Sequence, residues 1–70
     1  MKIKDQIGKI YEGRFKVVDY KIIRRRYYFF LQNIFNNQVL KVEYRTMKKL
    51  DEGSTTISGI IHYKIKRRKI

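Results

Sequence analysis

The sequence predicts an α+β fold, mainly β, in which an antiparallel sheet of three to four strands carries one short helix. Stretches rich in β-branched and aromatic residues have the length and alternation of strands. Turn-forming residues separate these stretches, and the apolar spacing changes to that of a helix after Tyr44. The 70 residues suffice for one small domain, so we expect residues 1–70 to fold as a unit whose ends, 1–6 and 66–70, fray.

The first two strands are expected to form a hairpin. Residues Phe15–Ile23 are dense in β-branched and aromatic side chains, and Glu12 and Gly13 before them supply a turn. The arginine run at residues 24–26 interrupts the apolar pattern, and a reversal there brings residues 27–31 back beside the first strand. The prediction is a hairpin with three arginines at its tip.

A second reversal leads into the third strand. Asn36 and Asn37 tolerate the left-handed backbone conformation of tight turns, which places this turn at residues 35–38. Apolar and charged side chains then alternate through residues 39–44, as is typical of a half-buried strand.

The remaining residues predict a helix and a last strand. Thr46 can cap a helix over residues 46–52, whose apolar positions are three apart and which ends near Gly53. Residues 57–65 alternate again and predict the last strand. The expected core, besides part of the aromatic set, consists of Leu40, Val42, Met47, Leu50, Ile57 and Ile61.

Two structural alternatives stay open. Alternation requires that either Tyr28 and Phe30 or Tyr27 and Phe29 face the core. A small barrel of the SH3 or oligonucleotide-binding type has the same strand content as an open sheet, and the sequence does not separate the two.

Catalytic, metal and cofactor sites are not expected. The chain has no cysteine, and His62 is its only histidine, so neither a metal site nor a nucleophile–base pair has enough residues to assemble. Asp51 and Glu52 are adjacent near a helix end and point apart. The four glycines are scattered, so no phosphate-binding loop is present. We therefore expect a protein that is not an enzyme and needs no cofactor.

The positive charge indicates the class of partner. The chain has 18 Lys and Arg residues against 6 Asp and Glu, a formal net charge of +12 at pH 7. A phosphate backbone would offset the repulsion among these charges, so we expect nucleic acid or a complex that carries it. An acidic protein surface is the alternative. No membrane partner is expected and, because no apolar run or signal peptide is present, we expect a cytoplasmic protein.

The candidate contact residues are the basic clusters and one aromatic residue beside them. Three adjacent arginines cannot all be paired by six acidic residues shared across the chain, so at least two should be free to meet phosphate. A neighbouring tyrosine can stack on bases or be structural, and the lysine pair and basic tail can contact phosphate or merely be solvated. The predicted nucleic-acid-binding residues are Arg14, Arg24, Arg25, Arg26, Tyr27, Lys48, Lys49, Arg67, Arg68 and Lys69.

Several residues between positions 7 and 53 follow a recognisable layout: Gly8, Gly13, Arg14, Phe15, Val17, Tyr28, Phe30, Leu50 and Gly53. This layout resembles that of small phage-type domains associated with HNH endonucleases, which also carry cysteine pairs. No cysteine is present here, so aromatic residues alone would hold the corresponding hairpin. The resemblance implies a β-rich module, encoded by a phage or mobile element, that contacts DNA, and it favours DNA over RNA as the partner without deciding between them.

In size, charge and Lys-, Ile- and Asn-rich composition, the chain is also similar to the small anti-CRISPR-like inhibitors that phages direct against host defence nucleases. This second resemblance implies the alternative function, a basic inhibitor or adaptor that binds a host protein or ribonucleoprotein.

Overall fold

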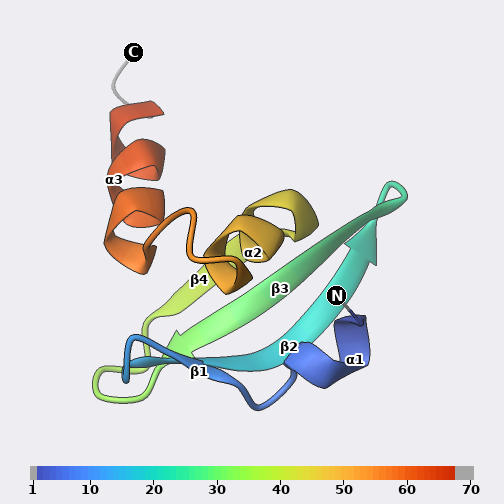
Figure 1. The fold of residues 1–70 in the computed structure, drawn as a ribbon, viewed down its shortest axis with the longest axis horizontal. Coiled ribbons are helices and arrows are strands. Elements are labelled where there is room, and N and C mark those ends of the chain that lie inside the picture. Colours follow the sequence, from blue (N-terminus) through green and yellow to red (C-terminus); the bar gives the residue numbers. More distant parts are fainter. Residues whose placement is uncertain (1, 68–70) are drawn as a thin grey trace.

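Four consecutive strands form one open antiparallel sheet in the order β1-β2-β3-β4. The computed structural model describes the backbone of residues 2–67 and the side chains of residues 2–62. The elements in Figure 1 are α1 (Ile3–Gln6), β1 (Ile10–Tyr11), β2 (Phe15–Ile23), β3 (Arg26–Asn33), β4 (Val39–Glu43), α2 (Tyr44–Asp51) and α3 (Ile57–Arg67). The predicted α+β class, mainly β and antiparallel, is confirmed, and the sheet is open rather than a barrel.

The first hairpin matches the sequence prediction closely. Strand β2 has the predicted bounds, and β3 runs back beside it with Phe15 opposite Asn33 and Ile23 opposite Arg26. The tip is therefore shorter than predicted, because Arg26 is already the first residue of β3. At the far end of β3, Asn33 is buried and its Oδ1 accepts the Phe35 N–H at 2.9 Å, which fixes the following turn.

The third strand and the helix after it are present, with a shifted boundary. Strand β4 ends at Glu43, and Tyr44 begins α2 instead of ending the strand. The helix starts two residues before the predicted start at Thr46, so Thr46 is not its N-cap. Met47 and Leu50 are buried on one side of α2, as their spacing predicts.

The predicted last strand at residues 57–65 is wrong, because this segment belongs to α3. Thr56 caps the helix: its Oγ1 accepts the Gly59 N–H at 3.0 Å. Glu12 also stabilises the helix start by accepting the Ile57 N–H at 2.5 Å. Ile57 and Ile60 are buried at a spacing of three, which is helical, and the alternation in the sequence concealed this spacing.

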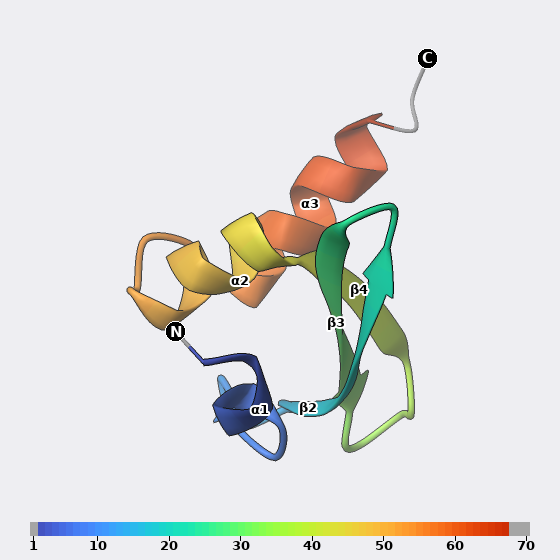
Figure 2. The same cartoon turned by 90° about the vertical axis from the view of Figure 1, so that its right-hand side faces the viewer.

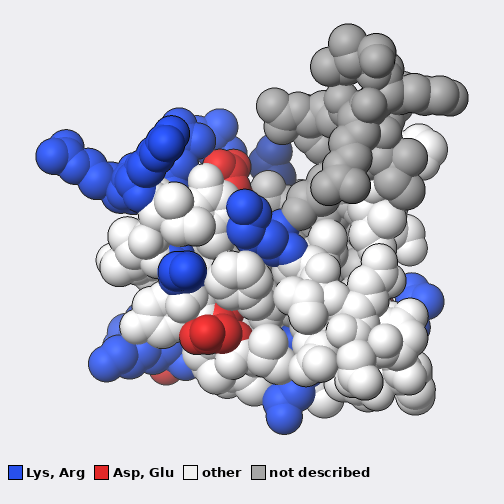
Figure 3. Space-filling view, turned by 180° about the vertical axis from the view of Figure 1, so that it is seen from behind, with Lys and Arg blue, Asp and Glu red and all other residues white. Residues whose placement is uncertain are grey.

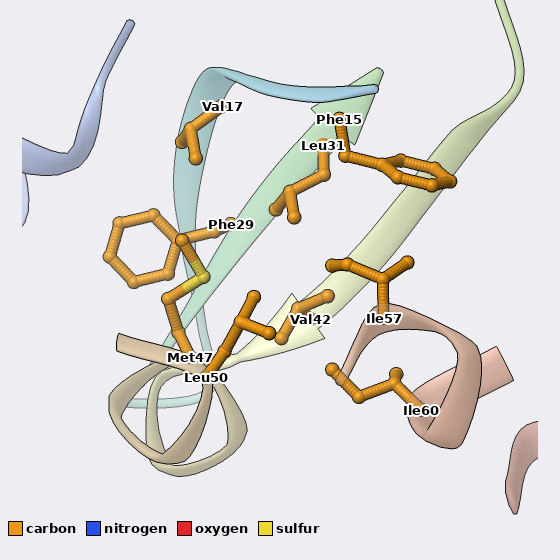
Figure 4. Packing of buried hydrophobic residues seen from close by; sticks show 9 residues of the cluster. All are labelled: Phe15, Val17, Phe29, Leu31, Val42, Met47, Leu50, Ile57 and Ile60. Atoms are coloured by element: carbon orange, nitrogen blue, oxygen red, sulfur yellow. The ribbon is translucent and has the colours of Figure 1, made fainter. Parts of the chain in front are cut away.

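The core lies between the sheet and the helices, all three of which are on one side of the sheet (Figure 2). Of the predicted core residues, Val42, Met47, Leu50 and Ile57 are buried, while Leu40 and Ile61 are half-buried and pack against them. Figure 4 shows the complete cluster of buried apolar side chains, which adds Phe15, Val17, Phe29, Leu31 and Ile60.

The aromatic run of β3 divides between the two faces of the sheet. Phe29 is fully buried, and cross-strand pairing puts Tyr27 on the same face. Tyr28 and Phe30 are half-buried on the opposite face. The structure thus selects the alternative in which Tyr27 and Phe29 face the helices.

Candidate nucleic-acid interface

The tip of the β2–β3 hairpin is a two-residue turn made of Arg24 and Arg25. Both residues have positive φ values, 50° and 67°, between the paired residues Ile23 and Arg26. A turn with two positive φ values has type I′ character, for which Asn-Gly is the favoured sequence. An arginine in the left-handed region costs about 1–2 kcal/mol. The tip therefore holds two arginines where local stability favours other residues.

The arginines of the hairpin differ in their ion pairing. Arg26 Nη1 lies 3.2 Å from Glu43 Oε1, an ion pair between β3 and β4. Arg24 and Arg25 are exposed, and neither forms an ion pair with any side chain that the structure describes. Two adjacent guanidinium groups are thus available to an external anion at one end of the molecule.

A groove beside this hairpin opens on the side of the sheet that carries the helices. Tyr20, Ile22, Tyr27 and Tyr44 line it between α1 and the start of α2, and its volume is about 720 Å³. The ring centroids of Tyr27 and Tyr44 are 6.4 Å apart, with the ring planes inclined by 53°. A second hollow of about 290 Å³ shares these two tyrosines and is also lined by Arg25. We call the four-residue lining the tyrosine groove, and it adjoins the arginine tip.

A β-bulge in β2 turns two residues of the tyrosine groove toward the helix side of the sheet. Val17 and Asp19 pair with successive residues of β3, which leaves Val18 as the extra residue. Strict alternation from the buried Val17 would turn Asp19 toward the helices. The bulge reverses the alternation, so that Tyr20 and Ile22 take that side and the charged residues of β2 point away.

The opposite face of the sheet carries no helix among the described elements (Figure 2). On this face Tyr28 lies between its cross-strand partners Lys21 and Glu43. Phe30 lies between Asp19 and Lys41. Lys41 Nζ is 5.2 Å from the centroid of the Tyr28 ring, a cation–π contact. In Figure 3, which looks at the molecule from this side, basic side chains gather at the upper left, toward the hairpin end, and further basic and acidic side chains are scattered among uncharged ones over the rest of the face. We call this surface the bare face.

The predicted contact residues fall into separate groups. Arg24, Arg25, Arg26 and Tyr27 lie together at the hairpin tip and beside the tyrosine groove. Arg14 is exposed in the turn before β2, at the opposite end of that strand, and its Nη2 lies 3.9 Å from a Glu12 carboxylate oxygen.

The other predicted residues are in the two C-terminal helices or beyond them. Lys48 and Lys49 are exposed on α2, which lies on the helix side of the sheet, across from the bare face. Arg67 is the last residue of α3, and Arg68 and Lys69 lie outside the described residues. The structure therefore brings together the hairpin group and leaves Lys48 and Lys49 on another element.

Sequence reasoning missed Tyr20 and Tyr44 as site residues. Tyr20 was one aromatic position in a strand whose bulge has no clear sequence signal, and Tyr44 was assigned to the end of a strand. Arg45, which lines the smaller hollow, was missed for the same reason as Tyr44. A helix start at Tyr44 would have placed this tyrosine and arginine beside the hairpin.

A polar cluster at the other end of the sheet fastens β1 to α1 and α2. The Tyr11 hydroxyl oxygen lies 2.8 Å from Gln6 Oε1 and 3.1 Å from Asp51 Oδ1, so its single proton is shared between these two acceptors. Lys9 Nζ donates to the same Asp51 oxygen at 3.3 Å. Burial, together with the hydrogen bond to Asp51 and its charge, raises the pKa of Tyr11 to about 12. The hydrogen bonds from Lys9 and Tyr11 lower the pKa of Asp51. Tyr11 is thus a neutral donor at ordinary pH.

Histidine and carboxylate side chains do not converge elsewhere in the described part of the chain. His62 is exposed on α3, and no three His, Asp or Glu side chains among the described residues are grouped so that they could hold a metal ion. Within residues 2–67, no helix has both the length and the apolar composition needed to cross a membrane.

The tyrosine groove and the arginine tip take no functional assignment from a known protein. The resemblance to domains associated with HNH endonucleases, and that to small inhibitors, stay predictions from the sequence. Comparisons of the chain with models of protein families, with curated proteins and with solved structures found no match.

Proposed function

We propose that the protein binds nucleic acid in the cytoplasm without catalysing a reaction, and that its hairpin tip contacts the phosphate backbone. The observation that carries this proposal is the pair Arg24 and Arg25, exposed in a strained turn and without ion-pair partners among the described side chains. Strained residues of this kind persist where function uses them. Two guanidinium groups side by side suit phosphate oxygens, which they can bind bidentately.

The charge and shape of the molecule support the same function. The net charge of +12 favours a polyanionic partner, because each basic group near a phosphate releases a condensed counterion. The β2–β3 hairpin projects beyond the helices at one end of the molecule (Figure 1), so its tip can approach a phosphate backbone without hindrance from the helices.

The test removes the two arginines and keeps the turn. In the double variant R24N/R25G, Asn and Gly suit the positive φ values, so the hairpin is expected to be at least as stable as in the unchanged protein. Affinity for a fluorescently labelled oligonucleotide should fall at low salt. The slope of log affinity against log salt concentration should become shallower by about 1.8 for duplex DNA or about 1.4 for a single strand if both arginines contact phosphate.

The double variant K48Q/K49Q is the matched control, because it removes the same charge from α2. Its salt slope should change less than that of R24N/R25G. Equal changes in both variants would show that only overall charge matters and that the tip has no special role. Absence of binding to any oligonucleotide at low salt would refute the proposed function itself.

An exposed apolar turn favours a second candidate, binding to a protein. Phe35 is 75% exposed at the β3–β4 turn, held by its N–H donating to Asn33, and Ile34 and Val39 beside it are also exposed. An aromatic side chain held in this way is suited to insert into a pocket of a partner. The function would then be that of the basic inhibitor or adaptor that the sequence left as its alternative.

The two candidates separate in a pull-down from a nuclease-treated lysate, followed by size-exclusion chromatography of the recovered complex. A protein-directed function predicts a stoichiometric complex that survives nuclease and is lost in Phe35→Ser, together with weak oligonucleotide binding. The nucleic-acid function predicts that nuclease removes the captured proteins and that Phe35→Ser binds oligonucleotides normally.

A further inference from the structure

We infer that the tyrosine groove receives unpaired bases, so that the target of the protein is single-stranded nucleic acid, either DNA or RNA. This inference rests on the proposed function and adds the class of nucleic acid that the hairpin surface recognises. The bases would enter the groove, and the arginine tip would hold phosphates beside it.

The first support is the aromatic and concave lining. Tyr20, Tyr27 and Tyr44 converge from two strands and one helix on a hollow of about 720 Å³, far more space than a single base fills. The 53° inclination of the Tyr27 and Tyr44 rings means that these two rings do not stack flat on each other. Ring faces of this kind bind the planar faces of bases, with little preference for base identity.

The second support is that only an unpaired base can make this contact. In a duplex, neighbouring base pairs cover both faces of each base, so a ring in this groove cannot stack on them. Proteins that read single strands splay the bases out and stack them on aromatic side chains. A duplex would meet the arginine tip through phosphate contacts alone and would gain nothing from the groove.

The third support is the charge around the groove. Apart from the ion pair of Arg26, the two adjoining hollows are lined by four basic residues and one acidic residue: Lys2, Lys4, Arg25, Arg45 and Asp5. The lysines lie at the α1 end and the arginines at the hairpin end. A strand whose base sits between them can therefore place phosphates near basic side chains on both sides of the groove.

The bare face is the competing site, and the structure favours the groove over it. Tyr28 and Phe30 offer rings there, but Tyr28 already contacts the Lys41 ammonium group. Tyr27 is 37% exposed and lies in the hollow that Arg25 also lines, which links ring and tip in one site. Because Tyr27 and Tyr28 are neighbours on opposite faces, they form a matched pair of positions for a test.

The binding experiment uses fluorescence anisotropy with labelled oligothymidylate and oligouridylate of about 12 nucleotides, and with a duplex hairpin of the same length. We expect both single strands to bind at least about tenfold more tightly than the duplex. Tyr27→Leu should weaken single-strand binding about tenfold and leave duplex binding unchanged, whereas Tyr28→Leu should change neither. Tyr27→Phe should bind like the unchanged protein, because it keeps the ring.

A spectroscopic experiment reports the stacking directly and does not depend on affinity. The chain has no tryptophan, so Tyr27→Trp and Tyr28→Trp each introduce a single reporter at the two positions. A base stacked in the groove should quench the fluorescence of the Trp at position 27 when a saturating single strand is added. The Trp at position 28 should respond little, and the duplex should quench neither.

The outcomes distinguish this inference from the proposed function. Equal affinity for duplex and single strand, with Tyr27→Leu unchanged, overturns the inference and leaves the proposed function standing. If only Tyr28→Leu loses single-strand affinity, and the Trp at position 28 is quenched, the bases bind on the bare face and the inference is overturned. Binding of polyglutamate as tightly as oligothymidylate overturns the inference in favour of an acidic protein partner. Absence of all oligonucleotide binding refutes the proposed function and the inference together.

Discussion

Phe29 is the side chain on which the small core depends most. It is fully buried between β2 and β4, whereas Phe30 is half-buried on the bare face. Phe29→Ala should therefore lower the free energy of unfolding by about 3–5 kcal/mol, which in a domain this small approaches its whole stability. The sequence alone suggested such a loss of about 3 kcal/mol for Phe30→Ala if that ring were in the core. Because Phe30 is only half-buried, we now expect Phe30→Ala to lower the free energy of unfolding by less than about 2 kcal/mol.

Urea denaturation followed by circular dichroism measures both changes. Phe30→Ala serves as the matched control, because it removes the same side chain from the neighbouring residue on the other face. A larger loss of stability in Phe30→Ala than in Phe29→Ala would contradict the burial of the two rings.

Tyr11 makes stability depend on pH at the alkaline side. Its pKa in the folded protein is raised to about 12 from the ordinary value of 10.0. Because the folded pKa lies above the unfolded one, the stabilisation from Tyr11 is fully present below pH 10 and is lost as the pH rises through about 12. Asp51 acts in the opposite direction: its pKa is lowered from 3.8, so its stabilisation is present above that value and is lost in acid.

The comparison of the unchanged protein with Tyr11→Phe isolates this effect from the titration of the lysines. The difference in urea midpoint between the two should be constant near neutral pH and should shrink between pH 10 and 12, where the hydroxyl ionises in the unfolded chain first. A difference that stays constant through this range would contradict the raised pKa of Tyr11.

At the scale of the elements, the Thr56 hydroxyl group caps the N-terminus of α3, together with the Glu12 carboxylate that accepts the Ile57 N–H. Thr56→Ala removes the oxygen that accepts the Gly59 N–H and should lower the free energy of unfolding by about 1 kcal/mol. Ser54→Ala is the control, because Ser54 is exposed and precedes the cap. Urea unfolding measures the stability of both variants. Equal losses of unfolding free energy in Thr56→Ala and Ser54→Ala would show that Thr56 does not act as the cap.

The first hairpin could be predicted from the sequence and α3 could not, for a physical reason. In Phe15–Ile23, strand-forming residues and the flanking turns all favour the same structure, so the bounds were correct. In residues 57–65, Ile57 and Ile61 are four positions apart. This spacing places them on one face of a strand, where every second residue shares a face, and also on one face of a helix, where residues three or four apart do. Only the cap at Thr56 and the distant carboxylate of Glu12 favour the helix, and the second is a tertiary contact.

At the scale of the whole molecule, charge repulsion and nucleic-acid binding respond to salt in opposite ways. The dimensions of the molecule are 35 × 31 × 23 Å, comparable with the screening length of about 30 Å at ~0.01 M salt. At ~0.15 M the screening length falls to about 8 Å, which weakens repulsion across a protein of net charge +12. The urea midpoint should therefore rise with NaCl over this range, while oligonucleotide affinity falls.

Unfolding of the unchanged protein in urea at the two salt concentrations measures this effect. A midpoint that falls with salt would show that the three exposed ion pairs of the described residues contribute more to stability than the repulsion removes.

The candidate site was only partly predictable because it is assembled by the whole fold. The arginine run and Tyr27 are adjacent in sequence, and the sequence singled them out together. Tyr20 and Tyr44 are 24 positions apart and reach the same groove only through the strand pairing and the start of α2. No local pattern contains that information.

The bulge at Val18 makes chain length in β2 more critical than residue identity. A substitution between Asp19 and Ile23 alters one side chain on one face. Deletion of Lys21 with the hairpin turn kept would remove the bulge and pair Val18 with Phe30, which would carry Asp19 inward and Tyr20 outward. Deletion of Val18 itself would leave Asp19 and Tyr20 on their present faces. Related sequences that keep this groove should therefore vary in residue identity between positions 19 and 23 but keep the length of this segment, and a deletion should be tolerated only at position 18.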